Sequence, residues 1–109
     1  MAMMRTAAVI LAAGLSRRLG YSKFRLSIDG VPVIEKVVGP FLDIPLDRVI
    51  VVSGYDREII DRDLARFDVQ VVFNPDYLEG MGASVRSVLP FLADVDVALF
   101  HLGDKPCVS

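Results

Sequence analysis

The sequence is poor in residues that crosslink a fold or enclose zinc, with one cysteine, Cys107, and one histidine, His101. A single cysteine excludes an internal disulfide framework and is typical of a reducing compartment, so we expect a cytoplasmic protein. One histidine and one cysteine are too few for a closed zinc site. We expect His101 to pack within the fold and assign it no chemical role.

Long apolar runs and net positive charge are also missing. No apolar run reaches the length of a membrane span, and the formal net charge is −2. We therefore expect neither a membrane nor a nucleic acid as partner. The run "TAAVILAAGL" after Arg5 has some features of a signal peptide, but it leads directly into "SRRLGYSKFR". A buried first strand is the better interpretation.

Acidic residues are absent from the start of the chain. Residues 1–28 hold five of the twelve Lys and Arg but none of the fourteen Asp and Glu. The whole chain is 53% hydrophobic and 24% charged, which is typical of a folded protein, and 109 residues make at most one domain. The basic segment therefore stands out from an otherwise acidic chain.

Apolar runs rich in β-branched residues alternate with segments of helical spacing. The runs are nearly continuous, as in strands covered on both faces, and they are "TAAVIL" (6–11), "RVIVV" (48–52), "VQVVF" (69–73) and "VDVALFHL" (95–102). This alternation predicts an α/β fold with a mostly parallel sheet. The last run would need cover on both faces, yet too little sequence follows it to form a covering helix. We expect that the chain is part of a longer protein or that a partner covers this strand, and we favour the first.

Three helices are expected between these strands. The first has apolar residues at i, i+3, i+4 and i+7, namely Ile34, Val37, Val38 and Phe41. Gly39-Pro40 is expected to kink this helix or end it early. We expect Asp56 to cap the second helix and Ser84 to cap the third.

Each predicted strand is followed by a distinctive tail. In strand order the tails are "AAGLSRRLGYSK", "SGYD", "NPDYLEGMGAS" and "LGDKP". Ligands of open α/β sheets bind outside the carboxyl ends of the strands, where parallel strands bring such tails together. The sequence therefore predicts a binding site at this edge.

The first tail has the composition of a phosphate-binding loop. Ala12, Ala13 and Gly14 are small enough for main-chain N–H groups to approach an anion. Side-chain charge follows from Arg17, Arg18, Lys23 and Arg25. The tail is neither a P-loop nor a G-x-G-x-x-G motif. The alternative is a solvated basic loop, and the position after a buried strand favours function.

The third and fourth tails offer further candidates. Asp104 follows an apolar strand and suits Mg²⁺ shared with substrate phosphates, although a turn aspartate would look the same. Gly80 and Gly82 would let the main chain approach a flat ligand beside a helix N-terminus near Ser84. A plain junction between a loop and a helix has the same pattern.

Together, "VILAAGLSRRLGYSK", "NPDYLEGMGAS" and "HLGDKP" resemble the NTP-transferase domain of molybdenum cofactor cytidylyltransferases, relatives of the molybdopterin guanylyltransferases. The resemblance extends from about residue 6 to residue 107 and implies a Rossmann-like three-layer αβα fold, similar to nucleotide-diphosphosugar transferases. It implies transfer of CMP or GMP from the nucleoside triphosphate to the phosphate of molybdopterin, with release of pyrophosphate. "LAAG" resembles the cytidylyl branch, whereas the guanylyl branch more often has a second glycine there, so the resemblance implies CTP rather than GTP as donor.

The resemblance also assigns roles to residues. Leu11, Ala12, Ala13 and Gly14 would contact the nucleotide, and Arg18 and Lys23 would hold the triphosphate and the transition state. Gly82 and Ser84 would line the base and ribose pocket, and Asp104 would bind Mg²⁺. Contact with a molybdoenzyme or a chaperone is a further expectation.

Members of the family are nearly twice as long as this chain. The resemblance therefore implies that residues 1–109 are the N-terminal, nucleotide-binding half of the domain, inactive or feeble when isolated. A transferase that activates a sugar or polyol phosphate and a non-catalytic nucleotide-binding module stay open as alternatives.

Overall fold

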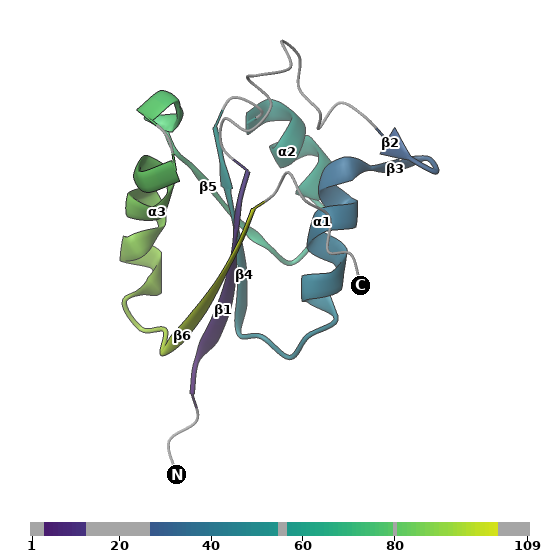
Figure 1. Ribbon diagram of the computed structural model, residues 1–109. Coiled ribbons are helices and arrows are strands. Elements are labelled where there is room, and N and C mark those ends of the chain that lie inside the picture. The colour runs from purple at the N-terminus through teal and green to yellow at the C-terminus, as the bar shows by residue number, and fades with distance from the viewer. Residues whose placement is uncertain (1–3, 13–26, 55–56, 80, 103–109) are drawn as a thin grey trace.

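The computed structural model describes residues 4–12, 27–54, 57–79 and 81–102 (Figure 1). The strands are β1 Thr6–Leu11, β2 Ser27–Ile28, β3 Val31–Pro32, β4 Arg48–Ser53, β5 Gln70–Phe73 and β6 Val97–Leu102. The helices are α1 Val33–Leu42, α2 Arg57–Leu64 and α3 Met81–Val88, with the short 3-10 helices η3 Tyr77–Glu79 and η4 Leu89–Leu92. None of these described helices has the length and apolar character needed to cross a membrane.

The main sheet has the strand order β5-β4-β1-β6, and each neighbouring pair is parallel. These strands are the four apolar runs that the sequence predicts, with bounds that differ by at most two residues. The predicted α/β fold with a mostly parallel sheet is confirmed. Because the strands are parallel, their carboxyl ends share one edge of the sheet.

Helices cover both faces of the sheet. Figure 1 shows α1 and α2 on one side and α3 on the other. Alternate residues of β1 point to the two sides, so Ala8 and Ile10 pack in the cluster with α1 and α2, and Val9 and Leu11 pack in the cluster with α3. This arrangement is the expected three-layer αβα sandwich, and β1 lies in its middle.

Helix α1 buries the four residues that its spacing predicts, namely Ile34, Val37, Val38 and Phe41. The expectation that Gly39-Pro40 ends this helix early is wrong, because α1 continues to Leu42 with Pro40 inside it. Phe41, beyond the proline, is buried in the core cluster beneath α1 and α2. Packing of this last turn outweighs the local preference of proline.

Two further local features differ from expectation. Helix α3 begins at Met81, so the prediction that Ser84 caps it is wrong and Ser84 lies within its first turn. The hairpin of β2 and β3 was not predicted. Its turn places Asp29 at φ 54° and Gly30 at φ 78°. The dipeptide Asp-Gly is a strong signal for such a turn, because both central residues need positive φ.

Strand β6 lies at one edge of the sheet, paired with β1. Leu99 and Phe100 point to opposite faces and are 49% and 46% exposed. The described residues therefore do not supply the cover that the sequence predicts for both faces of this strand. His101 packs against Phe41 of α1, with ring centroids 5.3 Å apart, as expected for a residue of the fold.

Candidate active site

The carboxyl edge of the sheet holds the first two residues predicted to contact a nucleotide. Leu11 ends β1, and the main-chain N–H of Ala12 donates to the carbonyl oxygen of Val52 at 2.9 Å, so pairing with β4 continues one residue further. Leu11 is 5% exposed and Ala12 is fully buried. Their side chains belong to the core, so a ligand at this edge would meet main-chain groups here.

The segments with the strongest predicted chemistry leave the sheet from neighbouring strands. Leu11 of β1 is the register partner of Leu102 of β6. The glycine-containing tail follows Leu11, and Asp104 follows Leu102 by two residues. Eight candidate site residues lie outside the described residues, namely Ala13, Gly14, Arg17, Arg18, Lys23, Arg25, Gly80 and Asp104, and so does the expected helix cap Asp56. Their approach to one another stays a prediction.

A buried polar pair joins the end of β5 to α3. The side-chain amide of Asn74 donates to the hydroxyl oxygen of Ser84, with Nδ2 and Oγ 3.1 Å apart. Asn74 is fully buried and Ser84 is 3% exposed. This pair holds the first turn of α3 against the carboxyl edge of the sheet.

Gly82 lies in the same turn of α3 and is exposed. A Cβ atom placed on Gly82 would meet no atom closer than Nη1 of Arg86, at 3.5 Å, which is an ordinary contact. The fold itself therefore leaves room for a side chain at this position. Arg86 is an exposed residue in the last turn of α3 whose guanidinium reaches back toward Gly82, and the sequence analysis did not single it out.

Two buried polar residues of this edge were missed from sequence. Ser53 ends β4 and Asn74 follows β5 directly, and both are fully buried. The hydroxyl of Ser53 has no hydrogen-bond partner within the part of the chain that the structure describes. The available signal was a polar residue placed directly after a β-branched run, where a parallel strand ends.

The described residues do not test the predicted magnesium site. Among residues 4–12, 27–54, 57–79 and 81–102, no group of three or more His, Cys, Asp or Glu side chains could hold a metal ion. The expected ligand, Asp104, lies outside these ranges.

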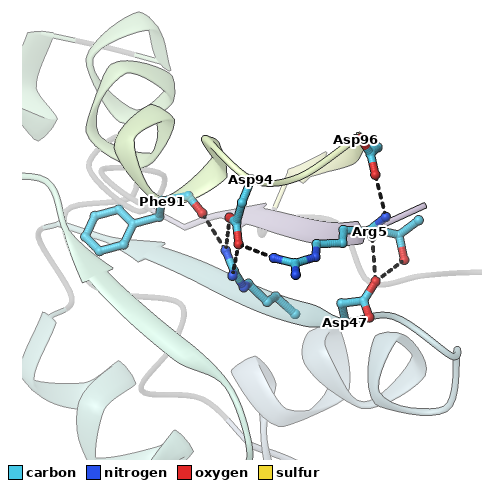
Figure 2. Close-up of polar contacts among 7 residues, drawn as sticks. Arg5, Asp47, Phe91, Asp94 and Asp96 are labelled. Carbon is cyan, nitrogen blue, oxygen red and sulfur yellow. Dashed lines mark hydrogen bonds and ion pairs between the residues drawn. The ribbon is translucent and has the colours of Figure 1, made fainter. Parts of the chain in front are cut away.

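The opposite, amino edge of the sheet carries a network of charges (Figure 2). Arg48 of β4 forms two hydrogen bonds with the carboxylate of Asp94, at 2.8 and 2.6 Å, and Arg5 adds a third at 2.8 Å. The hydrogen bond from Arg48 lowers the pKa of Asp94, although partial desolvation opposes this, and the same bond raises the pKa of Arg48. Both cations of this network are therefore paired with a carboxylate of the protein itself.

A cavity of about 490 Å³ also lies at the amino edge, between the end of α1 and the starts of β4 and β5. Its lining includes Phe41, Leu46, Asp68 and Val69. We assign it no catalytic role, because ligands of open parallel sheets bind at the carboxyl edge.

Two relatives align with almost the whole of this chain. The molybdenum cofactor cytidylyltransferase of Escherichia coli K12 is 30% identical over 102 residues, which cover 93% of this chain and 52% of that protein. The bifunctional protein GlmU of Francisella philomiragia is 33% identical over 108 residues, covering 97% of this chain and 24% of that protein. The chain thus spans about half the length of the first relative and a quarter of the second.

Solved structures share the fold. A nucleotidyl transferase from Methanothermobacter is 34% identical with a TM-score of 0.78, and the match covers 96% of this chain and 53% of that one. The structure of Rv0371c from Mycobacterium tuberculosis is 27% identical with a TM-score of 0.85, covering 100% and 57%. Residues 8–109 match the family model of the MobA-like NTP transferase domain. The chain therefore belongs to the MobA-like NTP transferase domain family.

Proposed function

We propose that this chain is the nucleotide-binding half of a nucleotidyltransferase that transfers CMP, or GMP, to the phosphate of molybdopterin and releases pyrophosphate. One observation carries the proposal. The match to an NTP transferase family extends over residues 8–109, and the parallel sheet brings the ends of all four strands in this match to one edge. That edge is where α/β sheets bind their ligands.

The choice of acceptor and donor rests on the relatives. The Escherichia coli relative is named a molybdenum cofactor cytidylyltransferase, and it aligns with 93% of this chain. A sugar phosphate or polyol phosphate is the second candidate, because the likeness is not limited to cytidylyltransferases of the molybdenum cofactor: the bifunctional protein GlmU is 33% identical over 97% of the chain. A non-catalytic nucleotide-binding module is a third. Contact with a molybdoenzyme or chaperone and a cytoplasmic location stay predictions from the sequence.

The proposed roles follow the order of the strands. Main-chain groups of Leu11 to Gly14 would approach the nucleotide, and Arg18 and Lys23 would offset charge on its phosphate oxygens. Gly82 and Ser84 would lie beside the base and ribose, next to the start of α3. Asp104 would hold a divalent cation, which supplies further charge neutralisation to phosphate oxygens when it is bound.

The reaction needs little proton chemistry from the protein. A phosphate oxygen of the acceptor attacks the α-phosphorus of the nucleoside triphosphate, the bond from that phosphorus to the bridging oxygen breaks, and pyrophosphate leaves. A phosphate monoester has a second pKa of about 6, so it is mostly a dianion near neutral pH and needs no general base. The task of the protein is to align the two substrates and neutralise their charge.

Two measurements test the proposal. Thermal shift with CTP, GTP, ATP and UTP, each with Mg²⁺, identifies the donor without knowledge of the acceptor, and we expect CTP to raise Tm most.

Pyrophosphate release by the complete natural protein with CTP, Mg²⁺ and molybdopterin tests the reaction. We expect the Asp104→Ala variant to keep its fold and lose Mg²⁺-dependent turnover. Binding of CTP without turnover in a natively short protein would instead support the non-catalytic module.

A further inference from the structure

Asn74 is a point where three segments of the carboxyl edge are joined. Its main-chain N–H donates to the carbonyl oxygen of Ser53 at 2.8 Å, which ties it to β4. Its side-chain Oδ1 accepts from the main-chain N–H of Asp76 at 2.9 Å, and its Nδ2 donates to Oγ of Ser84 at 3.1 Å. One fully buried residue therefore links a central strand, the loop before η3 and the first turn of α3.

The bond to Asp76 fixes the orientation of the amide. Because Oδ1 accepts the N–H of Asp76, the other end of the amide, which carries the donors, must face Ser84. The hydroxyl oxygen of Ser84 is then an acceptor, and Ser84 keeps its own proton to donate. Ser87, one position before the end of the same helix, instead donates to the main-chain oxygen of Ala83 at 2.9 Å.

Burial of an amide is not needed for packing at this place. Val72 and Val88 belong to an apolar cluster on this face of the sheet, which an apolar residue after β5 could extend. Such a residue would leave the N–H of Asp76 and the hydroxyl of Ser84 without the partner that Asn74 provides. A buried amide with its partners in place specifies one geometry for the groups that it joins. Asn74 thereby fixes the first turn of α3, which holds Gly82 and Ser84, the residues proposed to lie beside the nucleoside.

We propose that Asn74 is a positioning residue for the nucleoside triphosphate, acting through Ser84 and the first turn of α3. It does not touch the nucleotide. This inference rests on the proposed function of the same edge, and it adds a residue whose effect is on donor affinity. Loss of the bond to Ser84 would let the start of α3 move relative to β4 and β5, and the donor site would lose its fixed shape.

Three substitutions separate the two side-chain bonds. Asn74→Ala removes both. Asn74→Ser keeps a short acceptor that can close a turn to the N–H of Asp76, but it cannot reach Ser84. Ser84→Ala removes the second partner, and Ser87→Ala is the matched control, since it deletes the same hydroxyl from the same helix without touching Asn74.

The complete protein carrying each change is measured for Tm, for the Kd of CTP with Mg²⁺, and for kcat and both KM values, at a temperature where circular dichroism shows every variant folded. A hydrogen bond of this kind corresponds to about a fivefold to tenfold change in an equilibrium. We expect Asn74→Ser and Ser84→Ala each to raise the Kd of CTP by about that factor. The KM for CTP should rise in parallel, with kcat and the acceptor KM unchanged, and Ser87→Ala should match the wild type.

The double variant Asn74→Ser/Ser84→Ala decides whether the two residues act as one unit. We expect its Kd to equal that of either single variant, because the same bond is lost in all of them. Additive effects would overturn the inference, as would wild-type CTP affinity in Asn74→Ser. A fall in kcat together with a similar rise in both KM values would mean that Asn74 has a general structural role. A wild-type protein that binds no nucleoside triphosphate would contradict the proposed function itself, which keeps the two failures distinct. If Asn74→Ala does not fold, the other variants still give the answer.

Discussion

The two edges of the sheet use polar residues in opposite ways. At the amino edge, Arg5 and Arg48 share the carboxylate of Asp94, and these side chains are 37–61% exposed (Figure 2). At the carboxyl edge, Asn74 and Ser84 are almost fully buried and uncharged. The cations that the sequence assigns to this second edge, Arg18 and Lys23, come from a segment without acidic residues. Charges that pair within the protein, as at the amino edge, suit stability. Cations in a segment whose own sequence holds no acidic residue suit an anionic ligand, which is the role predicted for Arg18 and Lys23.

The first way to sharpen this comparison is to remove a cation assigned to the carboxyl edge. Loss of a preorganised charge contact in a transition state typically costs about 3–4 kcal/mol, or 10²–10³ in rate. We expect Lys23→Ala in the complete protein to lower kcat by this factor without lowering Tm, measured by pyrophosphate release and calorimetry. Lys36→Ala removes an equal charge from the exposed side of α1 and is the control. Near-normal turnover of the Lys23 variant would remove this residue from the mechanism.

A second test uses Gly82, where the fold leaves room for a Cβ atom. Alanine is more favourable than glycine inside a helix by up to about 1 kcal/mol, so Gly82→Ala should keep or raise Tm. If the nucleoside approaches the main chain here, the added methyl group should weaken CTP binding by about tenfold, which corresponds to 1.4 kcal/mol. Titration calorimetry and a thermal scan measure the two effects. Unchanged affinity would mean that the ligand does not approach this turn.

The carboxyl edge could be foreseen from sequence because its signals are local. Each strand is one continuous apolar run, and the tail that follows it is adjacent in the chain, so parallel pairing places the starts of all four tails at one edge of the sheet. Whether the residues further along the tails approach one another stays a prediction. The same reasoning placed Ile34, Val37, Val38 and Phe41 in the core. It was wrong about the early end of α1 at Pro40, where the last turn packs in the core, and about the cap of α3, because Ser84 lies inside that helix.

The amino edge could not be foreseen, because its contacts join residues that are far apart in the sequence. Arg5 and Asp94 are separated by 89 positions, and Arg48 and Asp94 by 46. Nothing in a list of charged residues indicates which of the fourteen acids will lie between which of the twelve bases. The hydrogen bond between Asn74 and Ser84 could not be predicted from sequence for a related reason. A polar residue after a strand is common, and its partner depends on where α3 begins.

A third test separates stability from function by breaking the amino edge. In Asp94→Ala, the guanidinium groups of Arg5 and Arg48 lose their shared counter-charge and repel each other. We expect Tm to fall by more than in Asp68→Ala, which removes an exposed carboxylate from the loop before β5. The affinity for CTP should be unchanged in both, because the change lies at the far edge of the sheet. A loss of affinity in Asp94→Ala would couple the two edges and contradict the division proposed here.

The smallest effect expected is a pH dependence of stability that belongs to the amino edge. Arg48 lowers the pKa of Asp94 below its ordinary value of 3.8, so the folded state favours the ionised carboxylate. This stability is present above the unfolded pKa and is lost as the pH falls below about 4 and through the folded pKa. The raised pKa of Arg48 adds no change near neutral pH, because arginine stays protonated there in both states.

The difference in Tm between the wild type and Asp94→Asn should therefore be constant from pH 7 to about 5 and shrink between pH 4 and 2.5. Thermal scans across this range measure it. A difference that stays constant down to pH 2.5, or one that shrinks as the pH rises from 5 to 8, would mean that the charge of Asp94 does not stabilise this edge.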